Sequence, residues 1–174
     1  MSPLVIRPAI LDDIPAITRI YADAVRHGTA TFEIEPPGEA EMAHRMQALL
    51  SGSFPYFVAE AAGTVVGYAY AGPYRDRPAY HWCIEDSIYI APEFHRLGVG
   101  RALLDRLIAE AESRGFRQMI GVIGDSANTA SIAVHAAAGF ALIGTFRSVG
   151  FKHGRWLDTV LMQRPLGASD SLPP

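Results

Sequence analysis

Apolar residues recur at the spacing of one helix face in four segments of the chain. The clearest segment, residues 14–27, follows Asp12 and Asp13 and precedes Gly28. An acidic residue suits the cap at the start of a helix, and glycine suits its end. The same reasoning predicts helices at residues 39–50, 102–114 and 128–138, the last two ended by Gly115 and Gly139.

Shorter segments rich in β-branched and aromatic residues lie between these helices and predict strands. They are residues 5–7, 56–61, 65–73, 85–90, 119–123, 141–149 and 156–163. Strands and helices therefore alternate only in part along the chain. This order predicts an α/β (α+β) fold of three layers, in which a mixed central sheet of about seven strands packs with about four helices.

The chain closes on PLGASDSLPP, a polar segment ended by prolines. We expect a single domain over residues 1–166 and a disordered tail over residues 167–174. A chain of 174 residues is long enough to bury a core without help from disulfides or metals.

Composition narrows the classes of protein to consider. The formal net charge of −3 disfavours a dedicated nucleic-acid binder, which usually carries a basic excess. Cys83 is the only cysteine, so the chain has no internal disulfide and no four-thiolate zinc site. The opening MSPLVIRPA does not read as a signal peptide, and the most apolar run, residues 127–144, is too polar to span a bilayer. We expect a cytoplasmic protein with no membrane or nucleic-acid partner.

The segment SIYIAPEFHRLGVGRALL runs from a predicted strand through a loop into a helix. Gly98 and Gly100 let backbone N–H groups approach a ligand closely, and the start of a helix favours negative charge. The segment therefore predicts a pyrophosphate cradle, although a loop that only needs two flexible residues is the simpler alternative. It is not a P-loop, which needs Lys and Ser/Thr after the last glycine, nor a Rossmann loop, which needs a small residue where Leu103 stands.

HRLGVGRALL resembles the acetyl-CoA-binding loop of the GNAT superfamily of N-acetyltransferases, whose pattern is Gln/Arg-x-x-Gly-x-Gly/Ala. The Gln/Arg position holds His95 here. NTASIAVHAAAGF is similar to the second signature of the family, in which an Asn opens a helix that ends in Gly-Phe/Tyr. The resemblance implies the GNAT fold, acetyl-CoA as cosubstrate, and contacts from His95, Arg96, Leu97, Gly98, Val99, Gly100 and Arg101, made mostly by backbone amides.

Two further segments, AYAGPYRDRPAYHWCIEDSIYIAP and VGFKHGRWLDTVLMQ, resemble the phosphinothricin N-acetyltransferase branch of this superfamily. That branch also acetylates methionine sulfoximine and methionine sulfone. The similarity extends from the first predicted strand to about Leu166. It implies a small-molecule amine acceptor, an activity associated with herbicide resistance, and a homodimer.

Acetyl transfer to an amine needs a group that takes a proton, because an ammonium has no lone pair. Glu85 starts the strand that leads to the glycine-bearing loop, and it matches the catalytic glutamate proposed for the family. Burying a carboxylate in an otherwise apolar strand is costly. We expect Glu85 to be the general base, directly or through water, against the alternative of a strand-edge Glu facing water. Asp86, on the opposite face of a regular strand, is the second candidate.

The resemblance also implies roles along the cofactor. The main chain of Ile88, Tyr89 and Ile90 would pair with the pantetheine arm like an added strand. Asn128 resembles the family asparagine that bonds to pantetheine or to neighbouring backbone, and it also suits the cap of the predicted helix. His135 stands where many members carry a Tyr near the CoA sulfur. Its imidazole could protonate the leaving thiolate, or it could be a packed residue.

The acceptors of this branch carry a carboxylate and a second strongly polar group, which arginine suits. Candidate acceptor-binding residues are Phe32, Tyr74, Arg75, Arg77, Asp86, Lys152 and His153, with Arg155 beside them. The alternatives are solvated loop charges and, for Phe32, an ordinary core aromatic.

Other functions stay open on the sequence alone. Aminoglycosides, polyamines and protein N-termini are the competing acceptors, although the basic residues of the acceptor segments disfavour polycations. A non-catalytic CoA-binding protein is a further alternative, against which Glu85 and Asn128 argue.

Two chemistries of other classes are weaker alternatives. A cysteine enzyme built on Cys83 with His81 or His135 lacks a nucleophile-elbow pattern, and a small buried hydrophobe is the simpler interpretation of Cys83. A metal site built from His81, Glu85 and His95 has no known ligand spacing, so we expect no metal.

Overall fold

The computed structural model describes residues 3–173, and within this range it contains one seven-stranded sheet and four α-helices. The strands are β1 (Leu4–Pro8), β2 (Tyr56–Ala61), β3 (Thr64–Pro73), β4 (Cys83–Ile90), β5 (Gln118–Gly124), β6 (Ala141–Lys152) and β7 (Arg155–Pro165). The helices are α1 (Ile14–His27), α2 (Glu39–Ser51), α3 (Val99–Ser113) and α4 (Thr129–Ala137). The predicted fold class and order of elements are confirmed.

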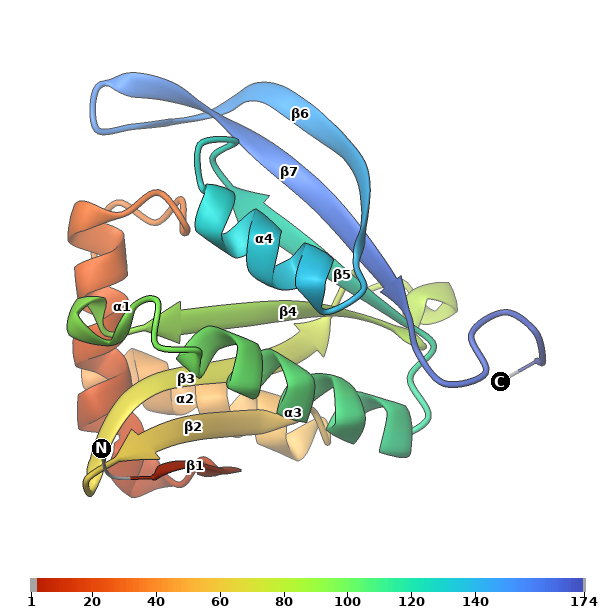
Figure 1. Ribbon diagram of the computed structural model, residues 1–174, viewed down its shortest axis with the longest axis horizontal. Helices are drawn as coiled ribbons and strands as arrows, with labels where there is room; N and C mark the ends of the chain where they lie inside the picture. The colour runs from red at the N-terminus through yellow and green to blue at the C-terminus, as the bar shows by residue number, and fades with distance from the viewer. Residues whose placement is uncertain (1–2, 174) are drawn as a thin grey trace.

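The sheet has the order β1-β2-β3-β4-β5-β7-β6, and only the β4–β5 pair is parallel. Helices α1 and α2 pack on one face of the sheet, and α3 and α4 lie on the other (Figure 1). Two apolar cores follow from this arrangement. Ile17, Met46 and Tyr68 lie in the first, and Ile84, Leu104 and Met119 lie in the second, all of them fully buried.

The two central parallel strands separate toward their carboxyl ends. Pairing between β4 and β5 runs from Cys83 opposite Gln118 to Asp86 opposite Gly121, and there it stops. Both strands continue beyond this point, and Figure 1 shows them diverging there. The start of α3 and the loop between α1 and α2 lie at the same end of the sheet (Figure 1).

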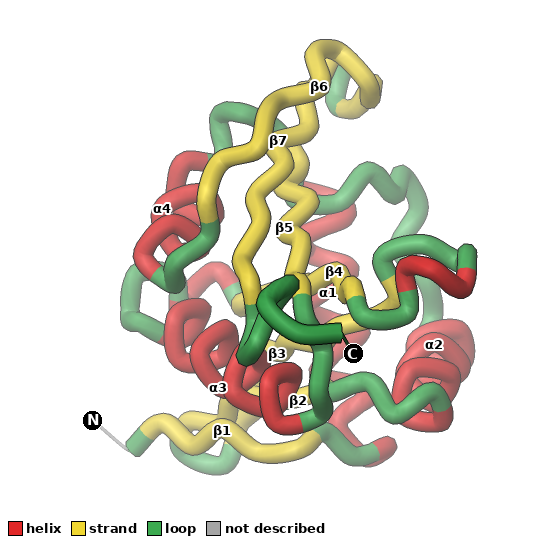
Figure 2. The backbone as a smooth tube through the Cα atoms, turned by 90° about the vertical axis from the view of Figure 1, so that its right-hand side faces the viewer, coloured by secondary structure: helices red, strands yellow, loops and turns green. Residues whose placement is uncertain are grey.

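Two tight turns join the strands of the β2–β3 and β6–β7 hairpins. Ala62 and Gly63 join β2 to β3, and His153 and Gly154 join β6 to β7, with positive φ at all four residues. Consecutive residues of positive φ form the two-residue turn that matches the twist of paired strands. The β6–β7 strands are consequently longer than the sequence predicts, and their tip projects beyond the rest of the molecule (Figure 2).

The acidic residue predicted to cap α1 stands at the cap position, but its side chain does not bond to the helix. Asp13 makes no side-chain cap, and its carboxylate accepts two hydrogen bonds from the Arg7 guanidinium and one from the Ile10 amide. A bidentate guanidinium is a stronger partner than a helix amide. Asp13 therefore ties β1 to the start of α1.

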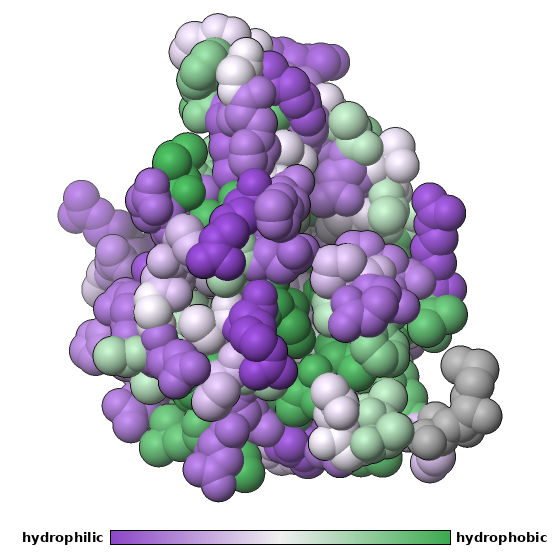
Figure 3. Space-filling view, turned by 90° about the vertical axis from the view of Figure 1, so that its left-hand side faces the viewer, coloured by the Kyte–Doolittle hydropathy of each residue, from purple (hydrophilic) through white to green (hydrophobic). Residues whose placement is uncertain are grey.

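The chain beyond β7 forms turns as far as Pro173. Leu166 is fully buried in the second core, and the Gln118 side chain donates a hydrogen bond to the Ser169 hydroxyl. The division into a domain and a disordered tail stays a prediction. Viewed from the side of α1, the surface is mostly hydrophilic with hydrophobic patches between (Figure 3). No helix within residues 3–173 is long and apolar enough to cross a membrane.

Candidate active site

A pocket lies where β4 and β5 separate. Three elements and one loop supply its wall, and their contributing residues are 86–89 of β4, 122–124 of β5, Asn128, Ser131 and His135 at α4, and Ala30 of the α1–α2 loop. The pocket exists because the parallel pairing ends at Asp86 and Gly121 while the backbone of both strands continues. Beyond this point residues 87–90 of β4 and 122–124 of β5 do not pair with each other, so the edges that face each other can receive a ligand.

Glu85 is half-buried on the face of β4 that α1 and α2 cover. Alternate residues of a strand face opposite ways, and Tyr89 packs in the α1–α2 core while Ile88 packs in the α3 core. Burial raises the pKa of Glu85, the Asp86 charge adds to this, and Arg75 opposes it. The carboxyl is thus placed to hold a proton more readily than an exposed Glu does. Glu85 does not line the pocket itself, but its neighbours Asp86 and Ser87 do.

Asp86 and His135 meet on the opposite face. The Asp86 Oδ2 and His135 Nε2 atoms are 3.0 Å apart, and both side chains are almost fully buried. The other ring nitrogen of His135, Nδ1, lies 2.8 Å from the Ser131 carbonyl. Burial by itself would lower the pKa of His135, but the hydrogen bond and the charge of Asp86 raise it overall. The structure therefore places the two predicted proton-handling residues, Glu85 and His135, on opposite sides of β4.

The start of α3 has no side-chain cap. Gly98 is the cap residue, with φ of +83°, and the first helical hydrogen bond runs from the Ala102 amide to its carbonyl. The amides of residues 99–101 therefore precede the helical hydrogen bonds. A Cβ built on Gly98 would meet nothing within 4 Å, so this backbone is bare. A helix start of this kind favours an anion.

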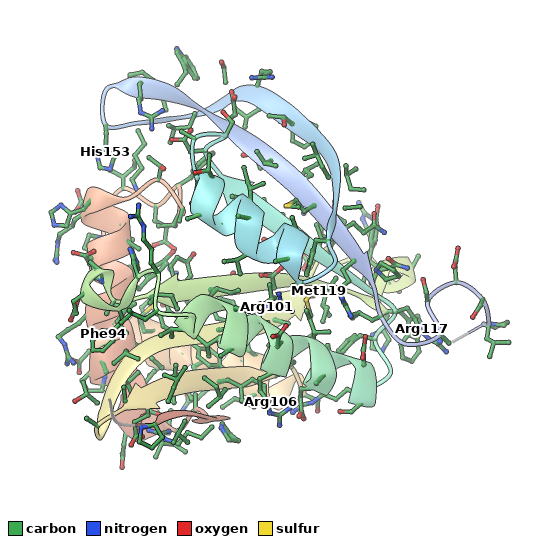
Figure 4. The ribbon with its side chains drawn as sticks, viewed as in Figure 1. Phe94, Arg101, Arg106, Arg117, Met119 and His153 are labelled. Atoms are coloured by element: carbon green, nitrogen blue, oxygen red, sulfur yellow. The ribbon has the colours of Figure 1, made fainter. Side chains whose placement is uncertain are left out.

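The side chains of the predicted loop are less available than its backbone. The Arg101 guanidinium bonds to Asp105 and to the Ala137 carbonyl, which ties α3 to α4 (Figure 4). The ring of His95 lies 3.0 Å from the Ile90 carbonyl. Arg96 has φ of +62° and is exposed, as is Leu97, while Val99 is buried in the second core.

The other predicted cofactor residues lie along the pocket. Ile88 and Tyr89 line it, and Ile90 continues the strand while β3 occupies the other edge of β4 up to this residue. Asn128 also lines the pocket, and its Oδ1 accepts a hydrogen bond from the Ser131 amide at the start of α4. Asn128 therefore caps its helix from a position beside the pocket.

The first predicted acceptor segment lies before β4. The Arg75 guanidinium stacks over the Tyr74 ring, 4.3 Å from its centroid, and the Tyr80 ring packs edge-on against Tyr74. Arg75 is close enough to Glu85 for its charge to oppose the rise in the pKa of that carboxyl. Arg77 is exposed nearby.

The second predicted acceptor segment bonds to the α1–α2 loop instead of facing open space. Lys152, only 4% exposed, donates from Nζ to the Thr31 carbonyl at 2.8 Å. The ring of His153 lies 3.2 Å from the Gly28 carbonyl, at the hairpin tip labelled in Figure 4. The Phe32 ring packs against Gly150, where a Cβ would lie 2.4 Å from it. A role for these residues in holding the acceptor stays a prediction.

Sequence reasoning missed part of the pocket and one residue that supports it. The missed lining residues are Ala30, Ser87, Val122, Ile123, Gly124 and Ser131. Asp125, which is buried, accepts hydrogen bonds from Arg155 and Thr29 and so links β7 to the α1–α2 loop. The carboxyl ends of two predicted neighbouring parallel strands could have indicated residues 122–124. The loop contacts are long-range and have no local pattern.

Cys83 and the possible metal ligands concern the two alternative chemistries, a cysteine enzyme and a metal site. Burial raises the pKa of the Cys83 thiol, the opposite of what a thiolate nucleophile needs. Within residues 3–173 no three His, Cys, Asp or Glu side chains form a group that could hold a metal.

Comparison with known proteins matches this chain to N-acetyltransferases of the GNAT family. Residues 17–140 match the model of the acetyltransferase (GNAT) family. The chain is 56% identical over 163 residues to a phosphinothricin N-acetyltransferase from Alcaligenes faecalis, covering 94% of this chain and 83% of the relative. It is 37% identical over 169 residues to an L-methionine sulfoximine/L-methionine sulfone acetyltransferase from Pseudomonas paraeruginosa, covering 97% and 98%.

A solved structure gives the same result in three dimensions. It is a GNAT superfamily phosphinothricin acetyltransferase from Sinorhizobium meliloti in complex with AcCoA. It superimposes with a TM-score of 0.96 at 48% identity, covering 98% of this chain and 92% of that one.

Proposed function

Because the chain belongs to the GNAT family of acetyltransferases, we propose that it acetylates the primary amine of a small amino-acid-like acceptor of the phosphinothricin, methionine sulfoximine and methionine sulfone class. The chain is an acetyl-CoA-dependent N-acetyltransferase. One structural observation carries the proposed mechanism. The parallel strands β4 and β5 separate beside the bare start of α3, with Glu85 on one side of β4 and His135 on the other.

The residues present fit acetyl-CoA. The amides of residues 99–101 are placed to receive the pyrophosphate, since no side chain caps this helix and Gly98 adds no Cβ there. The pantetheine arm would pair with the edge of β4 from Ile88 to Ile90, which β5 leaves free. His95, Arg96, Leu97 and Arg101 would contribute mainly through backbone, and Asn128 would contribute at the start of α4. When bound there, acetyl-CoA supplies the activated acetyl group.

Glu85 acts as the general base in this proposal. Its half-buried carboxyl, whose pKa burial raises, takes the proton that the acceptor amine must lose. The charge of Arg75 acts on this carboxyl, so the acceptor would approach from the side of Glu85. The leaving thiolate would face His135 on the other side, and this separation keeps the base away from the acid.

Arg75 and Arg77 are the proposed partners of the acceptor's anionic groups, with Tyr74 and Phe32 as aromatic walls. Lys152 and His153 would contribute less directly, because both already bond to carbonyls of the α1–α2 loop. A lining that contains arginines disfavours polycationic acceptors such as aminoglycosides and polyamines.

We also propose that the chain works as a homodimer in the cytoplasm. Exposed apolar side chains line β6 and the start of β7, and they are Leu142, Ile143, Phe146, Val149, Phe151 and Trp156. Large exposed apolar side chains gathered on one strand pair can supply a contact surface between subunits.

The test of the proposed function is an initial-rate assay of free-thiol release from acetyl-CoA. The panel holds phosphinothricin, methionine sulfoximine, methionine sulfone, an aminoglycoside, a polyamine and a peptide with a free N-terminus. We expect turnover with the three amino-acid analogues. Turnover only with the polycations or the peptide would contradict the acceptor class, and cofactor binding without turnover on any amine would indicate a non-catalytic protein.

A further inference from the structure

Asp86 and His135 form a buried pair between β4 and α4. The side chains are 2% and 6% exposed, and the carboxylate oxygen lies 3.0 Å from Nε2. Both residues line the pocket between the separated strands. A buried carboxylate is costly unless a partner stabilises it, so the number of protons that the pair holds determines its net charge and its stability.

The hydrogen-bond partners of His135 fix how many protons the pair holds. Nδ1 lies 2.8 Å from the Ser131 carbonyl and 3.4 Å from the Ser131 hydroxyl. The carbonyl is the nearer partner and only accepts, so Nδ1 carries a proton. Nε2 faces Asp86 Oδ2 at 3.0 Å, and a hydrogen bond there requires one further proton between the two atoms. The pair is therefore either an imidazolium with a carboxylate or a neutral imidazole with a carboxylic acid. In both forms it holds one proton more than a neutral His beside an ionised Asp.

The surroundings hold the ring in this position. A Cβ on Gly121 of β5 would lie 3.0 Å from His135 Cδ2, and the Phe140 ring packs edge-on at 5.0 Å between centroids. Glu85 points to the opposite face of β4. Three charged side chains from other elements within residues 3–173 bond to α4 or to its end. Asp86 of β4 bonds to His135, Arg101 of α3 donates to the Ala137 carbonyl, and Arg164 of β7 donates to the Ala138 carbonyl.

We propose that Asp86 is a positioning residue that holds an additional proton between its carboxylate and His135 at the pocket wall. This proton is transferred to the CoA thiolate as the thiolate leaves. The inference rests on the proposed function, because it assigns the acid of that reaction. Both ring nitrogens of His135 are bonded, and the proton that faces the pocket wall is the one shared with Asp86, so it leaves as the hydrogen bond between them breaks. The acid is therefore the pair.

In the proposed reaction the amine lone pair forms the C–N bond, the C–S bond breaks, and the thiolate takes the electron pair. The shared proton moves from the pair to sulfur and leaves a neutral His135 with an ionised Asp86. Glu85 takes the proton that the amine nitrogen loses and releases it to solvent, and the pair regains its proton from solvent.

Asp86→Asn separates this role from packing. Asparagine has nearly the same shape, and its amide N–H₂ can donate to Nε2, so the contact is kept while the extra proton is lost. We expect kcat to fall by about 10- to 100-fold while the KM for acetyl-CoA stays within about twofold. The pH at which kcat declines on the alkaline side should also move to lower pH. Asp86→Glu, which restores a carboxylate, should recover part of kcat.

Asp23→Asn is the matched control, because Asp23 faces His27 on the exposed side of α1, with 3.9 Å between Oδ1 and Nε2. This substitution should leave kcat and its pH profile unchanged. An Asp86→Asn enzyme with the kcat and pH profile of the natural enzyme would overturn the proposal.

A second measurement does not depend on turnover. The NMR signals of the His135 ring, identified by their loss in His135→Gln, should titrate at lower pH in Asp86→Asn than in the natural chain. An unchanged titration would overturn the proposal. So would a shifted titration with unchanged kcat, since the pair would then hold a proton that the reaction does not use. Failure of the natural chain to acetylate any amine would instead contradict the proposed function, and the titration would still report on the pair.

Discussion

Glu85 and Asp86 are neighbours in the sequence, yet they lie in different environments. Glu85 is half-buried and has no hydrogen-bond partner among the described side chains that holds it ionised, while Asp86 is buried against His135. Regular strand alternation produces this difference, because it sends adjacent side chains to opposite faces of β4. Two carboxyls of one strand can therefore serve two steps of one reaction.

Glu85→Gln should lower kcat by about 10²- to 10⁴-fold, because it removes the proposed base while keeping the shape of the side chain. The KM for acetyl-CoA should change by less than about threefold, since Glu85 faces away from the start of α3. Steady-state kinetics with both substrates varied would measure this. A variant with near-unchanged kcat would remove Glu85 from the mechanism.

The same substitution makes a prediction about stability and pH. A carboxyl whose pKa is raised in the folded state contributes stability that is present below its unfolded pKa and lost as pH rises through the folded pKa. Glutamine does not ionise, so Glu85→Gln should match the natural chain in Tm near pH 4 and exceed it at pH 7 to 8. Thermal unfolding at these pH values would test the sign, and a lower Tm at pH 8 would contradict it.

Gly121→Ala should impair catalysis through His135. The added Cβ would lie 3.0 Å from Cδ2 and 3.2 Å from Nε2 of the ring, closer than such contacts normally are. The ring must shift, and we expect kcat to fall by about tenfold, the size of a modest loss in acid catalysis. Gly144→Ala is the control, because its Cβ would meet nothing within 4 Å. Equal kcat in the two variants would argue against a positioned His135.

At the scale of elements, the site depends on one strand pair and one helix start. The parallel β4–β5 pair stops at Asp86 and Gly121, and α3 begins with Gly98 beside the opening. The uncapped amides and the free strand edge both come from backbone, so they tolerate variation in the loop side chains. This explains how His95 can stand at the Gln/Arg position of the family pattern.

Gly98→Val should block the cofactor. Its φ of +83° is strained for any residue with a Cβ and more so for a β-branched one, so the loop would have to change shape. We expect the KM for acetyl-CoA to rise by more than about tenfold, the loss that a misplaced anion site gives. Gly38→Val is the matched control, since Gly38 caps α2 with a φ of −81° and open space around it. Normal acetyl-CoA affinity in Gly98→Val would refute the loop assignment.

Local sequence patterns predict the helices, the strands and the glycine-bearing loop before α3, although α3 begins at Val99, three residues earlier than the predicted start at residue 102. A carboxylate in an otherwise apolar strand indicates Glu85, and strand alternation indicates Asp86, whereas His135 is predicted only from the resemblance to the GNAT family. Local patterns could not show that Lys152 would bond to Thr31 or that Asp125 would link Thr29 to Arg155, since these contacts join segments far apart in the chain. The predicted strands leave residues 150–155 between them, whereas only His153 and Gly154 form the β6–β7 turn. The positive φ of His153 has no strong sequence signal.

At the scale of the whole molecule, the exposed apolar residues of β6 contrast with the hydrophilic surface seen over much of the α1 side (Figure 3). If this strand forms the proposed homodimer interface, a charge placed in its middle should separate the subunits. Phe146→Lys should halve the mass measured by analytical ultracentrifugation, because an unpaired charge is costly to bury in an interface. A natural chain that sediments as a monomer would contradict the homodimer.

The mild net negative charge also fits the whole-molecule account, because the charges that matter for function lie in particular places. Arg75 and Arg77 precede β4, and the charge of Arg75 acts on Glu85, while the positive end of α3 lies at the same end of the sheet as the opening. A small anionic acceptor and the cofactor pyrophosphate can therefore be attracted locally by a chain whose overall charge is −3.

The most direct test of the central claim is mass spectrometry of the products formed from acetyl-CoA and phosphinothricin by the natural chain. We expect N-acetylated phosphinothricin and free CoA in equal amounts, with both lost in parallel in Glu85→Gln. Release of CoA without an acetylated amine, or acetylated product at the natural rate from Glu85→Gln, would contradict an acetyl transfer assisted by Glu85 at the separated strands.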